Sequence, residues 1–323
     1  MTTSRLSRRN LFGLGLGRLM EGRLGALDLS GPDSEAPAQA DTNGSARRKE
    51  AARKAWGEGD SRALSARLEP AAAHLLEVCG VARGQRLLDV GAGDGNLALA
   101  AARAGAEVAA GDLSPVLVER GRRRTRGSGL EVEWSVADVE ALPYSDESFD
   151  CVASNFGVIY ADDPRRAVAE LDRVVRPGGT VALTAWASSG LMGRVLRMAA
   201  ERDGSAGQGA RPERWGRYET AVLHFSRFED FEMLDATLRM QFDSAAEMWE
   251  LFSAPPGPLT GALRAGADAG DLREEFLRLV VGERCESTDG VALELDYSVV
   301  RGRSQGDRRR LPLEARYGLP SPE

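Results

Sequence analysis

Apolar residues in the middle of the chain fall into short runs, and helix-like segments separate these runs. The run at 130–136 alternates apolar and polar side chains, which indicates a strand with one buried face. Between the runs, as at 97–103 and 164–175, the pattern changes to helical. A regular alternation of strands and helices predicts an α/β fold with a mostly parallel sheet. The five strands expected on this basis lie at 87–90, 107–112, 130–136, 149–156 and 180–186.

The last third of the chain continues this pattern less regularly. Residues 231–242 and 291–300 alternate apolar and polar positions and predict a sixth strand and a last strand. Before the first strand we expect a charged helix at 47–59, which contains Trp56, and an amphipathic helix at 63–79. Further helices are expected at 191–202, 219–225, 244–252 and 271–281.

Composition divides the 323-residue chain into one domain and two flanking segments. We expect a flexible leader and linker at 1–45, a domain at 46–302 and a flexible tail at 303–323. Residues 7–10 (Ser-Arg-Arg-Asn) are similar to a twin-arginine export signal, but Arg18 soon interrupts the apolar stretch that follows. A secretory signal needs about 7–15 apolar residues there. We therefore expect a cytoplasmic protein.

The loop after the first predicted strand has the most specific chemical pattern in the chain. It reads Asp89-Val90-Gly91-Ala92-Gly93-Asp94-Gly95, and an apolar helical run follows. Three glycines remove Cβ atoms from a strand-to-helix turn, so that a ligand can approach the backbone. A dinucleotide fingerprint has the spacing G-x-G-x-x-G, whereas the spacing here is G-x-G-x-G. Asp89 would also repel a pyrophosphate but would hold a cation or an amine. A plain tight turn is the alternative explanation.

Polar residues also follow the ends of the later strands. Asp112 ends the second strand, about 20 residues past the glycines, where such folds bind ribose hydroxyls. Its alternative role is to cap the helix that begins near Pro115. Asp138 and Val139 follow the third strand, with an exposed strand end as the alternative reading, and Asn155 ends the fourth. Because ligands of open α/β sheets bind at the carboxyl ends of strands, we expect these residues to line one site.

Together these motifs resemble those of the class I S-adenosylmethionine-dependent methyltransferases. The nearest branch is the one that acts on small molecules and includes the ubiquinone and menaquinone C-methyltransferases. The resemblance covers residues 56–186 well and extends loosely to about 302. It implies a Rossmann-like, doubly wound sheet of seven mostly parallel strands, with an antiparallel last strand, helices on both faces and helical cap insertions.

The resemblance also implies roles for individual residues. The loop Asp89–Gly95 would hold the methionine end of S-adenosylmethionine, and Asp112 would hold the ribose. The carboxylate of Asp138 and the backbone of Val139 would contact the adenine, and Asn155 would complete the cofactor site.

The charge and composition of the chain limit its partners. A formal net charge of −7 argues against general nucleic-acid binding. Only Lys49 and Lys54 among the 42 basic residues are lysines, which indicates a coding bias toward arginine rather than a phosphate-binding surface. The chain contains no run of 18 apolar residues, so the sequence predicts no membrane span. The three cysteines are far apart in the chain, so neither a disulfide framework nor a metal site is expected.

The acceptor site is less well defined than the cofactor site. We expect segments 187–230 and 244–290 to cap it, although apolar stripes of this kind also pack in protein cores. The weak candidates for proton transfer are Tyr160 and His224; a structural role is the alternative for His224, and His74 is expected to be structural. The apolar residues expected near the acceptor are Trp186, Met192, Trp215, Met248, Trp249 and Phe252.

The leading hypothesis is therefore an enzyme that transfers a methyl group by in-line displacement to a small apolar, aromatic or quinone-like acceptor. Methylation of a protein or RNA is an alternative, although the chain lacks the Asn/Asp-Pro-Pro-Tyr/Phe sequence of amine-methylating relatives at 154–157. A non-catalytic S-adenosylmethionine-binding regulator is another alternative. The glycine spacing disfavours a nicotinamide-dependent dehydrogenase. The oligomeric state and the methylated atom stay open.

Overall fold

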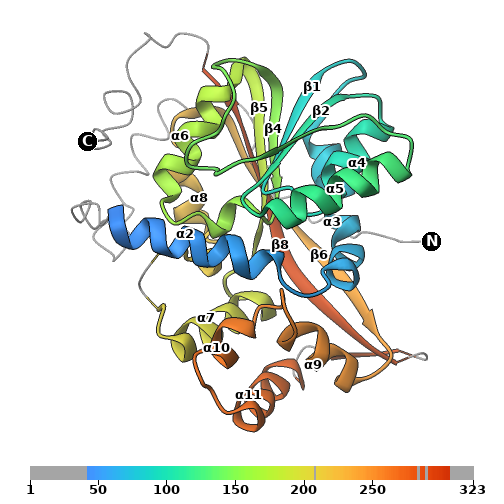
Figure 1. Cartoon of the computed structure of the whole chain (residues 1–323), viewed down its shortest axis with the longest axis vertical. Coiled ribbons are helices and arrows are strands. Elements are labelled where there is room, and N and C mark those ends of the chain that lie inside the picture. Colours follow the sequence, from blue (N-terminus) through green and yellow to red (C-terminus); the bar gives the residue numbers. More distant parts are fainter. Residues whose placement is uncertain (1–41, 207–208, 282–283, 288–289, 306–323) are drawn as a thin grey trace.

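The computed structural model describes residues 42–206, 209–281, 284–287 and 290–305 (Figure 1). The leader and tail predicted from the sequence therefore lie almost entirely outside the described residues. Within the described part of the chain, no helix has the length and apolar character needed to cross a bilayer.

One twisted sheet forms the centre of the molecule, with the strand order β3-β2-β1-β4-β5-β8-β6. Strands β1 to β5 pair in parallel, and β8 pairs antiparallel with both β5 and β6. This arrangement confirms the predicted doubly wound sheet with an antiparallel last strand. The strands are β1 Arg86–Val90, β2 Glu107–Asp112, β3 Glu133–Val136, β4 Phe149–Asn155, β5 Val175–Trp186, β6 Phe228–Phe242 and β8 Gly290–Ser304, and β7 Arg284–Ser287 pairs with β8.

Helices cover both faces of the sheet, as predicted. Helices α3, α4 and α5 lie on one side, and α6 and α8 lie on the other (Figure 1). The apolar strands explain this arrangement, because Leu87, Leu88, Val152 and Leu183 are fully buried between the two layers. The covering helices are α3 Arg62–Cys79, α4 Asn96–Arg103, α5 Pro115–Gly127, α6 Pro164–Val174 and α8 Tyr218–Phe225.

A second group of helices lies beyond the carboxyl ends of the parallel strands. Helix α7 packs against α10 and α11, and the long strands β6 and β8 extend toward this group (Figure 1). Helix α2 runs across the molecule between this group and the sheet. The helices of this part are α2 Thr42–Gly57, α7 Leu191–Asp203, α9 Ala245–Ser253, α10 Thr260–Arg264 and α11 Ala269–Val281.

The structure corrects several boundaries expected from the sequence. Helix α2 begins at Thr42, so residues 42–45 belong to a helix and not to the predicted linker. Its sequence has little apolar periodicity, and ion pairs of Arg48 and Lys49 with distant carboxylates hold it in place. Strands β6 and β8 are longer than predicted because they pair with each other along most of their length. Strand β7 and helix α10 were not predicted.

Candidate active site

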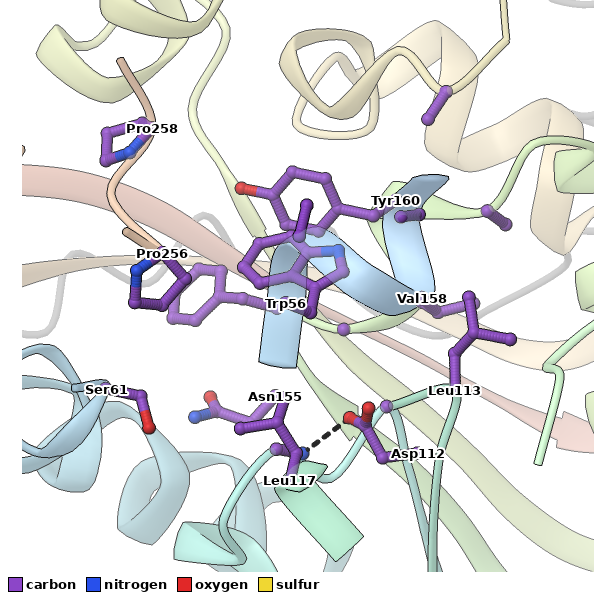
Figure 2. A pocket seen from close by; sticks show the side chains of 18 of the residues that line it. Trp56, Ser61, Asp112, Leu113, Leu117, Asn155, Val158, Tyr160, Pro256 and Pro258 are labelled. Carbon is purple, nitrogen blue, oxygen red and sulfur yellow. Dashed lines mark hydrogen bonds between the residues drawn. The ribbon is translucent and has the colours of Figure 1, made fainter. Parts of the chain in front are cut away.

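A cavity of about 560 Å³ lies at the carboxyl ends of the parallel strands, below helix α2 (Figure 2). One half is lined by the motif loops of the sheet, and the other half by residues of α2, α7 and the 252–264 segment. The predicted cofactor residues that line the cavity are Asp89, Gly91, Gly93, Asp112, Asp138, Val139 and Asn155. A single cavity thus joins the predicted cofactor residues to part of the predicted cap.

The glycine loop turns at the bottom of this cavity. Gly91 has a φ of 62°, and a Cβ atom there would lie 2.8 Å from the Cα atom of Gly157, so glycine permits the close approach of these two loops. Gly93 has a φ of 59° and open space where a side chain would point. Gly95, also predicted to bind the cofactor, is not among the lining residues. A Cβ atom there would lie 2.9 Å from the Trp134 ring, so this glycine serves packing.

Asp112 projects from the end of β2 beside the glycine loop (Figure 2). Its Oδ1 atom accepts the Ser114 N–H at 2.8 Å, and its Oδ2 atom accepts the Gly93 N–H at 2.8 Å. Each carboxylate oxygen has a second lone pair, so both retain the capacity to accept a hydroxyl from a ribose. Burial raises the pKa of Asp112 to about 6, against the opposing effect of the two backbone hydrogen bonds.

Asp89 is fully buried at the end of β1. Its Oδ2 atom accepts the Ala98 N–H at 2.9 Å and so caps the first turn of α4, whereas Oδ1 has no hydrogen-bond partner in the described part of the chain. Burial, together with the charge of Asp112, raises the pKa of Asp89 to about 7. A buried oxygen without a partner is costly. A donor or cation in the cavity would relieve this cost, so the residues fit the cationic methionine end of S-adenosylmethionine.

Asp138 lies at the edge of the cavity and is engaged by a residue that the sequence did not single out. Its Oδ2 atom accepts from the Lys49 ammonium at 2.7 Å, and its Oδ1 atom accepts the Glu140 N–H at 2.9 Å. The preceding residue, Arg48, forms a two-pronged pair with Asp162 at 2.6 and 2.8 Å. The only sequence signal for Lys49 was the scarcity of lysine.

Asn155 ends β4 and points into the cavity (Figure 2). Its Oδ1 atom accepts from the Thr184 hydroxyl at 3.1 Å, which fixes the orientation of the amide. The next residue, Phe156, has a φ of 58° and donates its N–H to the same hydroxyl at 2.8 Å. This turn directs the Phe156 ring toward Trp186, on which it stacks with a centroid separation of 3.9 Å.

The other half of the cavity is largely apolar. Of the residues expected near the acceptor, Trp186, Met192 and Phe252 line it. Three others do not, because they pack elsewhere: Trp215 against His224, Met248 in the core and Trp249 against Phe276. Lining residues that the sequence did not identify include Phe156, Leu196, Met240, Pro256 and Pro258.

Of the two candidates for proton transfer, Tyr160 lines the cavity. Its ring meets Trp56 of α2 edge-on at 4.9 Å, and its hydroxyl has no hydrogen-bond partner among the described residues (Figure 2). Burial, together with the charge of Glu213, raises the pKa of Tyr160 far above its usual value. The Tyr160 hydroxyl is therefore protonated at neutral pH and can donate a hydrogen bond.

The two histidines lie away from the cavity lining. His224, the other acid–base candidate, packs on Trp215 with a centroid separation of 4.5 Å. The Nδ1 atom of His74 lies 2.8 Å from the Tyr297 hydroxyl, and burial lowers the pKa of His74. Neither histidine is among the residues that line this cavity.

The fold and the site define a class of protein: a doubly wound α/β protein with carboxylates at consecutive strand ends, the place where such folds bind nucleoside cofactors. A model of the methyltransferase domain family matches residues 88–183, which span the glycine loop and the lining carboxylates. The chain is 35% identical to the uncharacterized protein Rv1403c of Mycobacterium tuberculosis over 242 residues, which is 74% of this chain and 85% of that protein. The chain therefore belongs to the S-adenosylmethionine-dependent methyltransferase family of enzymes.

Two further similarities bear on the branch and on the fold. The demethylmenaquinone methyltransferase of Clavibacter sepedonicus is 43% identical over 100 residues, which is 31% of this chain and 40% of that enzyme. The crystal structure of the YcgJ protein from Bacillus subtilis has a TM-score of 0.52 at 20% identity, and the match covers 72% of this chain and 98% of that one. The structural match shows the shared fold.

Proposed function

We propose that the enzyme transfers the methyl group of S-adenosylmethionine to a small, apolar, aromatic or quinone-like acceptor. The observation that carries this proposal is the two-part cavity of about 560 Å³, with carboxylates at its sheet end and aromatic side chains at the other. S-adenosylmethionine supplies a methyl group that is bonded to a sulfonium sulfur. When the acceptor displaces this sulfur, the leaving group is a neutral thioether, S-adenosylhomocysteine.

The carboxylate half of the cavity binds and orients the cofactor. Asp112 accepts the ribose hydroxyls with the lone pairs that Gly93 and Ser114 leave free. Asp89 faces the positive charge of the methionine end with its unpartnered oxygen. Asp138 accepts from the amine of the adenine, and the Val139 backbone lies beside the ring edge. These residues position the reactants, and placement in line is itself a large part of the rate acceleration.

The apolar half supports the assignment of the acceptor. Stacked Phe156 and Trp186 present flat aromatic surface, and Met192 and Phe252 add flexible and planar apolar contacts. Tyr160 offers one hydrogen-bond donor inside this surface. A planar ring with one oxygen substituent matches this set. The partial similarity to a demethylmenaquinone methyltransferase is consistent with such an acceptor.

Calorimetric titration with S-adenosylmethionine and S-adenosylhomocysteine tests the cofactor assignment. Wild-type protein should bind both, and Asp112→Ala should weaken both by at least about 10-fold, because it removes a buried charged acceptor. Methyl transfer from labelled S-adenosylmethionine to 2-naphthol and to hydroxynaphthoquinones then tests the acceptor class. Folded wild-type protein that binds neither ligand would refute the cofactor assignment. Transfer confined to protein or RNA would refute the acceptor class.

A further inference from the structure

Lys49 lines the cavity and bridges two carboxylates. It is one of two lysines among 42 basic residues, and it reaches from α2 to the loop after β3. Its ammonium lies 2.7 Å from Asp138 Oδ2 and 2.6 Å from Glu140 Oε2. Only 24% of its side chain is exposed, and only 4% of that of Glu140. The contact is thus a partly buried bridge between two carboxylates and not a surface ion pair.

The bridge controls the orientation of Asp138, because the Lys49 ammonium holds its Oδ2 atom. Burial lowers the pKa of Lys49, but its hydrogen bonds and charge interactions with Asp138 and Glu140 outweigh burial and raise it, so the ammonium stays charged. The Glu140 N–H holds the second oxygen of Asp138. Asp138 is therefore held at both of its carboxylate oxygens.

We propose that Lys49 is a positioning residue that makes the site selective for an aminopurine cofactor over its oxopurine counterpart. This inference rests on the proposed function, in which Asp138 faces the amine of the adenine. An ionised carboxylate only accepts hydrogen bonds, so it pairs with the exocyclic amine. The oxygen of a hypoxanthine ring is also an acceptor at that position. That oxygen and the Asp138 carboxylate would then face each other as two acceptors with no hydrogen bond between them, which disfavours binding.

Other contacts hold α2 in place without Lys49. Arg48 pairs with Asp162 through two hydrogen bonds, and Arg264 of α10 pairs with Glu58 just after α2. Trp56 packs edge-on against Tyr160 near the end of the same helix. Removal of the Lys49 ammonium therefore leaves α2 docked while it changes the environment of Asp138. This separation allows the selectivity role to be tested apart from a purely structural one.

The test compares the affinities of S-adenosylhomocysteine and S-inosylhomocysteine, which differ at the 6-substituent of the purine and in the proton on the neighbouring N1. Wild-type protein should prefer the adenosyl ligand by about 10-fold or more, the value of a hydrogen bond to a charged group. In Lys49→Met, nothing holds the Oδ2 atom of Asp138, so the carboxylate is no longer fixed toward the amine of the purine. The adenosyl affinity should fall by about 10-fold and the inosyl affinity by less than about 2-fold, so the preference collapses.

Lys54 supplies the matched control. It lies on the same helix, it is exposed, and Lys54→Met removes the same charge from the protein. This variant should keep both affinities. Lys49→Gln is a second neutral variant that retains polarity and a donor, and it should also lose the preference because its shorter side chain does not bridge the two carboxylates. It provides the test if Lys49→Met does not fold.

The outcomes separate the selectivity role from its alternatives. Equal losses for both ligands in Lys49→Met and Lys49→Gln would mean that Lys49 only holds α2, which overturns the inference. An unchanged preference would overturn it as well. If wild-type protein binds S-adenosylhomocysteine but these variants discriminate normally, the proposed function stands and only this inference fails. If folded wild-type protein binds neither ligand, the proposed function fails first.

Discussion

Asp89→Asn should stabilise the ligand-free enzyme at high pH, although it alters the cofactor site. The pKa of this fully buried carboxyl rises from 3.8 to about 7, mainly because burial disfavours its charge. The folded protein therefore keeps a proton that the unfolded chain loses as the pH rises from 3.8 to about 7. Stability contributed by this group falls through that window and stays low above it.

The size of the effect follows from the shift. A displacement of about 3 pKa units corresponds to about 4 kcal/mol at a pH above both values. At about pH 5 the loss is less than about 2 kcal/mol, because the folded carboxyl is still protonated there. The amide oxygen of an asparagine can still accept the Ala98 N–H, and its NH2 group takes the place of the unpartnered Oδ1. The substitution thus removes a buried charge and retains the helix cap.

Urea unfolding of the ligand-free protein at about pH 8 and about pH 5 measures the change in free energy. The gain should be about 4 kcal/mol at the higher pH and less than half of that at the lower one. Asp243→Asn, which changes an exposed carboxylate, should stay within about 0.5 kcal/mol at both pH values. The variant should also bind S-adenosylhomocysteine more weakly. Destabilisation at about pH 8, or a gain independent of pH, would refute the reasoning.

Three other predictions follow from the geometry of the cavity. Because the pKa of Asp112 is about 6, affinity for S-adenosylhomocysteine should weaken from about pH 7.5 to about pH 5.5 as the acceptor is protonated; a flat calorimetric profile would contradict this. Tyr160→Phe should weaken the binding of 2-naphthol by about 10-fold and leave the binding of naphthalene unchanged, because it removes one hydrogen-bond donor from the cavity. Tyr218 is 54% exposed, and Tyr218→Phe should change neither affinity. Gly91→Ala should lower the free energy of unfolding by about 1–3 kcal/mol, because the new Cβ atom would lie 2.8 Å from the Cα atom of Gly157. At Gly127 a Cβ atom meets open space, so Gly127→Ala should not destabilise the protein. Thermal or urea unfolding measures both variants.

The local patterns of the chain determined the fold class and the positions of most strands. The run before Asp89 is buried and apolar, and the glycines after it leave a strand-to-helix turn as the stable local conformation. Alternation of strands and helices then restricts the sheet to a parallel, doubly wound order. Since all carboxyl ends of such strands meet at one edge, the sequence also brought Asp112, Asp138 and Asn155 to a common site.

Only the tertiary structure decided which side chains complete that site. Lys49 and Asp138 are 89 positions apart in the chain, and a local sequence pattern does not predict a contact over such a separation. Trp249 and Phe252 are neighbours on one helix, yet Phe252 lines the cavity while Trp249 packs against Phe276. Gly95 matched the motif but serves packing against Trp134. Periodicity reports which residues are buried, whereas the partner of a buried side chain depends on how distant elements pack.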